Sequence, residues 1–407
     1  MRTHHLTSWV LLAGPALTTA GCGPTHLLPT RQIYQFSKPT YLQALHVRAN
    51  GDMLLGTVFP NASLYYLSAP PINDPDTPPT VTTLATFAGI PSPDGTTINA
   101  ITGIAETESG VFALTGGVQQ THHQPQQPQQ PTPPPDPPPE PFRRVETQTP
   151  PPPPHPSLRP PLLPAHPTIL LIADTSLGQI LRVDTRAQTW EVILSDADAG
   201  KGSVRYPPWA SLQFGVNGLT VRYAPSAAGD GEGEVGEDWG EYGEGEGGLW
   251  LYWSNSFLAT VYRLWITADG YPVGGGSGKT RRPLAEKVAS VRALFVDGLV
   301  SGPAPGSYSS DSSERRGKRE VLWAATNVDN TVRAISDRGE VTTVAGAPDE
   351  MTVAGAVAPR FGRRPGDEHT LYVATSGGLV LPVNGTELEG GKVVGIDTRG
   401  LFKCWEE

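Results

Sequence analysis

Amide and hydroxyl side chains at the ends of short apolar segments are the residues of this chain best suited to hold a substrate. Asn217 opens one such segment, whereas Asn255 and Asn327 each follow one. Groups of this kind orient a substrate through hydrogen bonds without exchanging protons with it. We predict that these three asparagines, with Thr102 and Thr375, bind substrate at the centre of the fold. The alternative is that they only shape turns, as Asn, Ser and Thr commonly do.

Motifs of the common hydrolases and nucleotide-binding enzymes are missing. The sequence has no Gly-x-Ser-x-Gly elbow, no His-Glu-x-x-His, no phosphate loop and no glycine fingerprint between a strand and a helix. Of nine histidines, only His46 and His369 lie in segments that we assign to the fold. A Ser-His-Asp mechanism would need one of them beside a serine and a carboxylate. The simpler interpretation is a strand residue at His46 and a loop residue at His369.

Two biased segments distort the composition of the chain, which has 407 residues and a net charge of −10. Residues 119–167 hold 20 of its 43 prolines, and residues 225–247 hold eight of its 40 acidic residues. We predict that both are disordered insertions in loops. The remainder is close to neutral and lacks the clustered Lys and Arg that phosphates require, so no nucleic-acid partner is expected.

The first 21 residues have the layout of a secretory signal peptide. Arg2 precedes the apolar run 11–17, and small residues follow at 18–21. This run is far shorter than the ~20 residues that cross a bilayer, so no membrane span is expected. A lipoprotein cleavage site before Cys22 is an alternative. With glycosylation sequons at Asn61 and Asn384, we expect a glycoprotein that is secreted or lies in the secretory-pathway lumen.

Two cysteines, Cys22 and Cys404, lie near the two ends of the chain. In a closed ring the ends meet, so a disulfide there would fasten the closure. Two free thiols are the alternative.

Short apolar segments of four to eight residues, bounded by Gly, Asp, Asn or Pro, dominate the rest of the sequence. They form six groups of paired segments, which begin near residues 44, 101, 168, 217, 293 and 370. Such repeats are more typical of a β-propeller than of a sandwich. We therefore predict an all-β fold, a six-bladed β-propeller over residues 31–403 that carries both insertions.

A series of short motifs along the chain carries a family resemblance. Three of them are 215–219 (GVNGL), 252–256 (YWSNS) and 391–397 (GKVVGID). These resemble the senescence marker protein/gluconolactonase (SMP-30-like) superfamily of six-bladed propellers. Four more motifs resemble a fungal secreted branch of that superfamily: 47–51 (VRANG), 59–65 (FPNASLY), 101–105 (ITGIA) and 344–346 (VAG). The resemblance runs from about Gln32 to Asp397, without the insertions.

That branch includes hetero-Diels-Alderases of tropolone-sesquiterpenoid pathways. The resemblance therefore implies a pericyclase of fungal secondary metabolism. It would hold an o-quinone methide-like diene against an alkene and stabilise the polarised transition state through oriented hydrogen bonds. No cofactor is expected, the substrate would be a small apolar molecule in the central pocket, and the protein would act as a monomer.

Two other functions are left open. A lactonase of the superfamily needs a divalent metal held by a Glu, by Asn and by an Asp, and only Asn217 matches an Asn ligand. Gln43 stands at the Glu position, and the Asp position falls at Arg292 or Ala293. Neutral donors bind calcium weakly, so we predict no metal site. The third possibility is a non-catalytic propeller that binds a small molecule or a protein.

Overall fold

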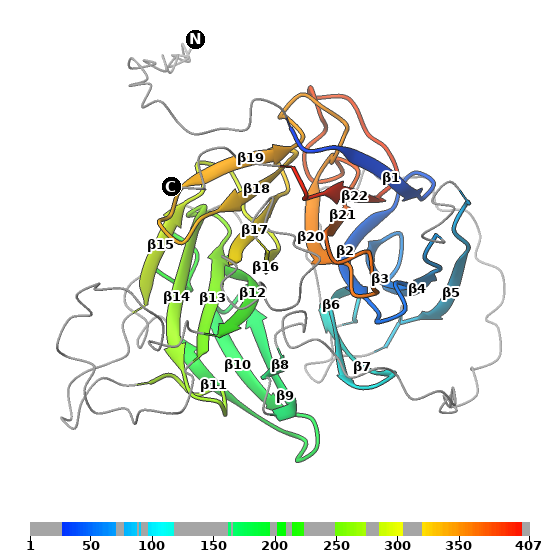
Figure 1. Cartoon of the computed structure of the whole chain (residues 1–407). Coiled ribbons are helices and arrows are strands. Elements are labelled where there is room, and N and C mark those ends of the chain that lie inside the picture. The colour runs from blue at the N-terminus through cyan, green and yellow to red at the C-terminus, as the bar shows by residue number, and fades with distance from the viewer. Residues whose placement is uncertain are drawn as a thin grey trace, which may run out of the picture.

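The computed structural model describes residues 27–70, 77–87, 89–90, 97–117, 162–163, 166–195, 202–208, 214–223, 249–273, 285–303 and 320–400. The helices and strands found in these ranges are all β-strands. They form antiparallel sheets arranged around a common centre (Figure 1). The predicted all-β propeller is confirmed.

Five sheets have four strands and one has two. The first four-stranded sheet has the order β2 (Tyr41–Val47), β3 (Met53–Phe59), β4 (Ser63–Leu67), β5 (Val81–Thr86). The two-stranded sheet pairs β6 (Ala100–Glu108) with β7 (Val111–Gly117). The next has the order β8 (Leu162–Leu163), β9 (His166–Asp174), β10 (Gln179–Asp184), β11 (Thr189–Ser195).

Two further sheets follow the same simple order along the chain. One contains β12 (Val216–Tyr223), β13 (Leu249–Asn255), β14 (Thr260–Ile266) and β15 (Glu286–Ser290). The other contains β16 (Leu299–Pro303), β17 (Glu320–Thr326), β18 (Thr331–Ile335) and β19 (Val341–Ala345). The first strands of neighbouring sheets contact one another, as β12 does with β16 and β2 with β6, so these strands surround the centre of the ring.

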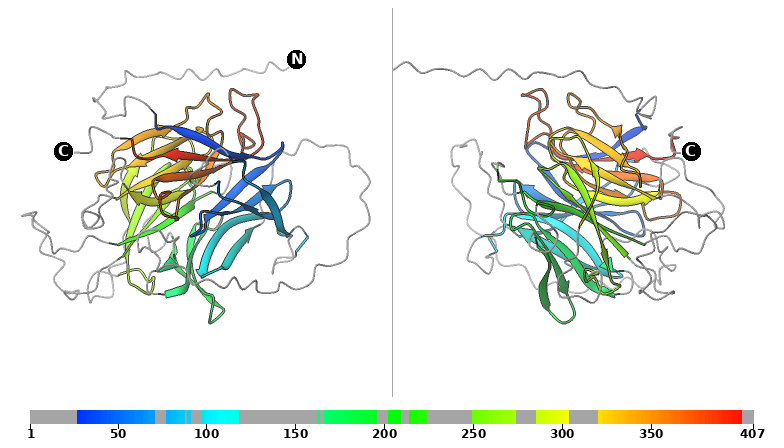
Figure 2. Two further views of the ribbon diagram at one scale, coloured as in Figure 1. Left: turned by 45° about the vertical axis from the view of Figure 1, so that its right-hand side comes forward. Right: turned by 90° about the vertical axis from the view of Figure 1, so that its left-hand side faces the viewer.

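The last sheet combines strands from both ends of the described chain. Its order is β1 (Thr30–Gln35), β22 (Lys392–Asp397), β21 (Thr370–Thr375), β20 (Ala356–Phe361). β1 lies against β22 with Thr30 opposite Ile396 and Gln35 opposite Lys392, and both views of Figure 2 show the two strands side by side. The ring is thus closed by its first strand, which removes an exposed sheet edge.

Apolar side chains between neighbouring sheets form the core. Trp323 of β17 is fully buried and meets the ring of Phe361 from β20 edge-to-face at 5.6 Å. Gly302 of β16 faces the same ring, and a Cβ at this position would overlap Phe361. Removing a buried Trp side chain costs about 3–5 kcal/mol, so contacts of this kind hold adjacent blades together.

Two predicted boundaries are wrong. The apolar stretch 293–297 was expected to be a strand, but the chain there is a loop and β16 begins only at Leu299. Arg292 adopts a left-handed φ of 55°, which interrupts an extended chain after β15. The predicted insertion 119–167 also overlaps β8 and the first two residues of β9.

Several other predictions lie outside the described residues: the signal peptide 1–21, Cys22, Cys404, most of 119–167 and all of 225–247. Asn61 and Asn384 are described and exposed. In the part of the chain that the structure covers, no helix is long and apolar enough to cross a membrane.

Candidate functional site

A buried carboxylate, Asp297, lies at the centre of the ring and accepts hydrogen bonds from three amides. Asn217 Nδ2 and Asn327 Nδ2 each donate to it at 3.0 Å, and Gln43 Nε2 donates at 3.3 Å. These residues come from three different sheets, since Gln43 is in β2, Asn217 in β12, and Asn327 follows β17. We call these four residues the Asp297 cluster.

The backbone around Asp297 fixes its position. Its N–H donates to Ala325 O at 2.9 Å, and its carbonyl accepts Gly218 N–H at 3.1 Å and Ser254 Oγ–H at 2.9 Å. A Cβ at Gly218 would overlap the backbone nitrogen of Leu299, so only glycine allows β12 this close approach. The motif around Asn217 therefore serves to bring β12 against the loop that carries Asp297.

Burial dominates the electrostatics of this carboxylate. It raises the pKa of Asp297 to about 6, although the three amide donors oppose the shift. Burial and the charge of Asp297 also raise the pKa of Tyr41 far above its usual value, so the phenol keeps its proton. Asn327 Nδ2 donates to Tyr41 Oη at 3.1 Å. Tyr41 as a whole residue is partly buried, and its hydroxyl keeps a proton that it can donate.

Two serines hold the amides in place. Asn217 Nδ2 also donates to Ser256 Oγ at 3.1 Å, and Ser376 Oγ donates to Asn327 Oδ1 at 3.3 Å. Both serines are fully buried. The orientation of each asparagine is thus set by a partner on either side, as a preorganised binding site requires.

Three phenylalanines form an apolar wall beside the cluster. The ring centroids of Phe214, Phe257 and Phe295 lie 5.4–6.3 Å apart, and each side chain is partly exposed. Their loops are tied together by the backbone, since Ser256 N–H donates to Gly215 O and Val296 N–H donates to Ser256 O. We call these three residues the phenylalanine wall. Phe214 precedes Asn217 by three positions, and Phe295 precedes Asp297 by two. Phe257 directly follows Ser256, the serine that accepts a hydrogen bond from Asn217.

The predicted site residues separate into two groups. Asn217 and Asn327 meet at Asp297, as described above. Asn255 is fully buried, and its Nδ2 instead donates to carbonyls of the loop 202–205 at 2.9–3.3 Å. Thr375 is buried and accepts Lys392 N–H at 3.0 Å, whereas Thr102 is exposed on β6 and lies 3.3 Å from Thr115 Oγ1. A substrate-binding role for all five stays a prediction.

Sequence analysis missed Asp297 and the phenylalanine wall. The acidic position was assigned to Arg292 or Ala293, but the structure places Asp297 with Gln43 and Asn217. Residues 291–297 form a loop rather than a strand, and the carboxylate lies at the end of this loop, at Asp297, instead of at the predicted position 292 or 293. The pair Asp297-Gly298, directly after an apolar run, was the signal that could have found it.

A divalent cation fits the Asp297 cluster poorly. Calcium is held by about six to eight oxygens, commonly with several carboxylates. Asp297 supplies one carboxylate, and three amide N–H groups already satisfy it. Across the described ranges, no three His, Cys, Asp or Glu side chains gather as metal ligands. We therefore derive no chemistry through a metal at this site.

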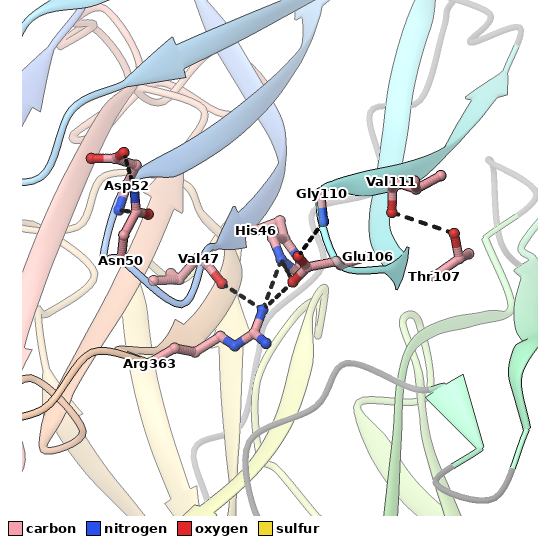
Figure 3. Close-up of polar contacts among 9 residues, drawn as sticks. All are labelled: His46, Val47, Asn50, Asp52, Glu106, Thr107, Gly110, Val111 and Arg363. Carbon is pink, nitrogen blue, oxygen red and sulfur yellow. Dashed lines mark hydrogen bonds and ion pairs between the residues drawn. The ribbon is translucent and has the colours of Figure 1, made fainter. Parts of the chain in front are cut away.

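A second carboxylate, Glu106, is partly buried, lies toward the far ends of the inner strands and is paired with a cation (Figure 3). Arg363 Nη1 donates to Glu106 Oε2 at 2.6 Å and to Val47 O at 3.2 Å, and His46 Nε2 lies 3.5 Å from the same carboxylate oxygen. Gly110 N–H donates to Glu106 Oε1 at 3.1 Å. We call His46, Glu106 and Arg363 the Glu106 cluster; it joins β2, β6 and the chain after β20.

The charges of the Glu106 cluster compensate one another. Burial alone would raise the pKa of Glu106, but hydrogen bonds from His46, Arg363 and Gly110 lower it to about 2. Burial lowers the pKa of His46, so the imidazole is neutral near pH 7. His46 is thus a buried strand residue in an ion-pair cluster, as the simpler interpretation of the sequence predicts.

Comparison with known proteins agrees with the resemblance that the sequence motifs indicate. No family model matches the chain. It is 22% identical over 395 residues to a protein of Sarocladium schorii provisionally named hetero-Diels-Alderase asR5. This alignment covers 92% of this chain and 84% of the relative. A provisionally named hetero-Diels-Alderase of Phoma sp is also 22% identical, over 369 residues. That alignment covers 85% of this chain and 86% of the relative. The family resemblance is confirmed. The likeness to the hetero-Diels-Alderase relatives spans most of both chains, so it concerns the whole propeller.

Solved structures of SMP-30-like proteins are similar at a greater distance. The calcium-binding protein regucalcin from Agrobacterium tumefaciens is 13% identical with a TM-score of 0.43, covering 92% of this chain and 96% of its own. A gluconolactonase from Xanthomonas campestris is 10% identical with a TM-score of 0.36, covering 91% and 89%.

Proposed function

We propose that the chain is a hetero-Diels-Alderase-like pericyclase of fungal secondary metabolism. The observation that carries this proposal is the Asp297 cluster beside the phenylalanine wall: a phenol, Tyr41, that the cluster holds in place, near three partly exposed aromatic rings. The names of the two relatives support it. We further propose that the protein enters the secretory pathway, on the strength of its first 21 residues.

The chemistry follows from the donors. In a hetero-Diels-Alder addition the oxygen of the oxadiene gains negative charge as the alkene adds, and no atom leaves. A donor aimed at this oxygen stabilises the transition state more than the ground state. Tyr41 fits this role because its phenol is protonated near pH 7 and its oxygen is held in place by Asn327.

Asp297 acts as a positioning residue in this proposal. Its carboxylate holds Gln43, Asn217 and Asn327, and Asn327 in turn holds the Tyr41 oxygen. The donor is therefore in place before the substrate arrives, which avoids reorganisation during the reaction.

The phenylalanine wall supplies the apolar part of the site. Phe214, Phe257 and Phe295 pack against one another, and their partly exposed rings can contact a planar diene and its alkene partner. Holding two reactants together in a suitable orientation removes several kcal/mol of the barrier.

The test is a cycloaddition assay with purified full-length protein. An o-quinone methide is generated from an o-hydroxybenzyl alcohol in the presence of an electron-rich alkene, and the product is followed by chiral chromatography. We expect faster formation of one enantiomer, unaffected by a chelator and reduced in Tyr41→Phe. Racemic product at the background rate would overturn the proposal, and substrate binding without acceleration would indicate a non-catalytic propeller.

A further inference from the structure

Arg360, on β20, is a buried cation without an anionic partner. Its Nε is buried and makes no hydrogen bond, and its Nη1 donates only to the neighbouring carbonyl, Pro359 O, at 2.7 Å. Within the described ranges no carboxylate forms an ion pair with it. Other half-buried arginines differ, since Arg363 pairs with Glu106 and Arg222 with Glu320 and Asp337.

The charge at Arg360 persists although burial opposes it. Burial lowers its pKa to about 10, which leaves the guanidinium protonated near pH 7. A buried charge without a counter-ion is strongly unfavourable, and proteins normally pair such groups. An anion that binds at this position would relieve this cost.

The surroundings of Arg360 limit the charge of such an anion. Ala358, two residues earlier on the same face of β20, packs with Leu42 and Leu45 of β2, so Arg360 is directed toward β2. Its charge helps to lower the pKa of His46 on that strand. Since His46 is neutral and Arg363 is balanced by Glu106, one positive charge stays uncompensated among the neighbours on β2, β6 and the chain after β20.

We propose that Arg360 binds the carboxylate of a small monoanionic ligand, at the opposite ends of the inner strands from the Asp297 cluster. The edge of the guanidinium that carries Nε and Nη2 presents two parallel N–H groups, and a carboxylate accepts both. Arg360 as a residue is partly buried rather than fully buried, and a carboxylate that displaces the packing over its Nε would satisfy this unpartnered donor. A single uncompensated charge matches a monoanion better than a dianion such as hydrogen phosphate.

Thermal unfolding of the full chain in matched salts tests this site. Sodium acetate should raise the Tm by about 2 °C above sodium chloride of equal ionic strength. Arg360→Met should remove this difference and raise the Tm in chloride, because it deletes an unpaired buried charge. Arg360→Lys keeps the positive charge but lacks the two parallel N–H groups of a guanidinium. It should show less than half of the acetate effect.

Arg399→Met is the matched control, because Arg399 is an exposed arginine paired with Asp397 and should leave the acetate effect intact. Broadening of the acetate methyl NMR signal by wild type but not by Arg360→Met provides a readout independent of stability. An equal acetate effect in Arg360→Met, a lower Tm of that variant in chloride, or equal stabilisation by chloride or phosphate would overturn the proposal.

Discussion

Two carboxylates, the buried Asp297 and the partly buried Glu106, have pKa values displaced in opposite directions. Glu106 is paired with Arg363, and its pKa falls to about 2. Asp297 accepts three amide hydrogen bonds but has no cation against it in the described part of the chain, and its pKa rises to about 6. Neutral donors thus orient a buried carboxylate without fully offsetting its desolvation, whereas a guanidinium does offset it.

This difference separates stability from function. The Glu106 cluster ties β2, β6 and the chain after β20 together with compensated charges, so its loss should weaken the ring. The Asp297 cluster retains an energetically unfavourable charge, and in the proposed function this charge orients amides and a phenol. Perturbed carboxylates of this kind are typical of functional sites.

The largest expected effect is on stability, at the Glu106 cluster. Arg363→Met leaves Glu106 half-buried without its cation, and this should lower the free energy of unfolding by about 3–5 kcal/mol. Denaturation in urea measures it. The double variant Arg363→Met/Glu106→Gln removes both charges and should recover part of the lost free energy of unfolding. No recovery would show that the ion pair between Arg363 and Glu106 does not stabilise the contact of β2, β6 and the chain after β20.

The pH dependence of stability should have opposite signs at the two carboxylates. Asp297 releases its proton near pH 3.8 when unfolded and near 6 when folded, so its contribution falls as pH rises through that window, by about 3 kcal/mol in total. Asp297→Asn should remove this fall. Glu106 contributes stability above pH 4.5 that is lost as pH falls toward 2, and Glu106→Gln should remove that loss. Unfolding curves between pH 3 and 7 compare the variants; parallel curves for wild type and Asp297→Asn would contradict the raised pKa.

At the Asp297 cluster, the expected effect is on rate. Tyr41→Phe deletes the proposed donor and should lower kcat/KM about 100-fold while the free energy of unfolding changes by less than about 1 kcal/mol. The cycloaddition assay and urea denaturation report the two quantities. Tyr66→Phe, a tyrosine of the same blade on β4, is the control and should keep full activity.

The smallest expected effect distinguishes two asparagines of similar sequence context. Asn255→Ala leaves carbonyls of the loop 202–205 without their donor and should lower stability by about 1–3 kcal/mol. Asn217→Ala should reduce the rate, with a smaller loss of stability because Asn217 is partly exposed. If both variants lost only stability, Asn217 would be as structural as Asn255.

The ring itself could be predicted from the sequence, because alternating apolar segments and turn residues report local structure. The same reasoning placed Asn217 at the start of a strand, and the family resemblance placed Gln43 on the first inner strand; the structure has both residues in strands. The hydrogen bonds of Asn255 could not be predicted, because its partners lie about 50 residues earlier, in a loop with no periodic pattern.

The missing parts of the site depend on contacts between distant segments. Phe214, Phe257 and Phe295 come from three loops, and nothing in any one loop indicates the other two. Glu106 and Arg363 are separated by 257 residues. Asp297 was hidden because the apolar stretch before it has the composition of a strand but lies in a loop.

The pairing of β1 with β22 has a consequence for how the protein is made. Thr30 emerges from the ribosome long before its partner Ile396, so the last sheet cannot be completed until β22 has been synthesised. Until then the nascent ring is open and exposes unpaired strand edges, which are the surfaces most prone to aggregation. Closure joins residues more than 350 positions apart, and such long-range pairing is slow. Production of this protein in soluble form should therefore depend on conditions that limit aggregation of the open ring before β22 pairs with β1.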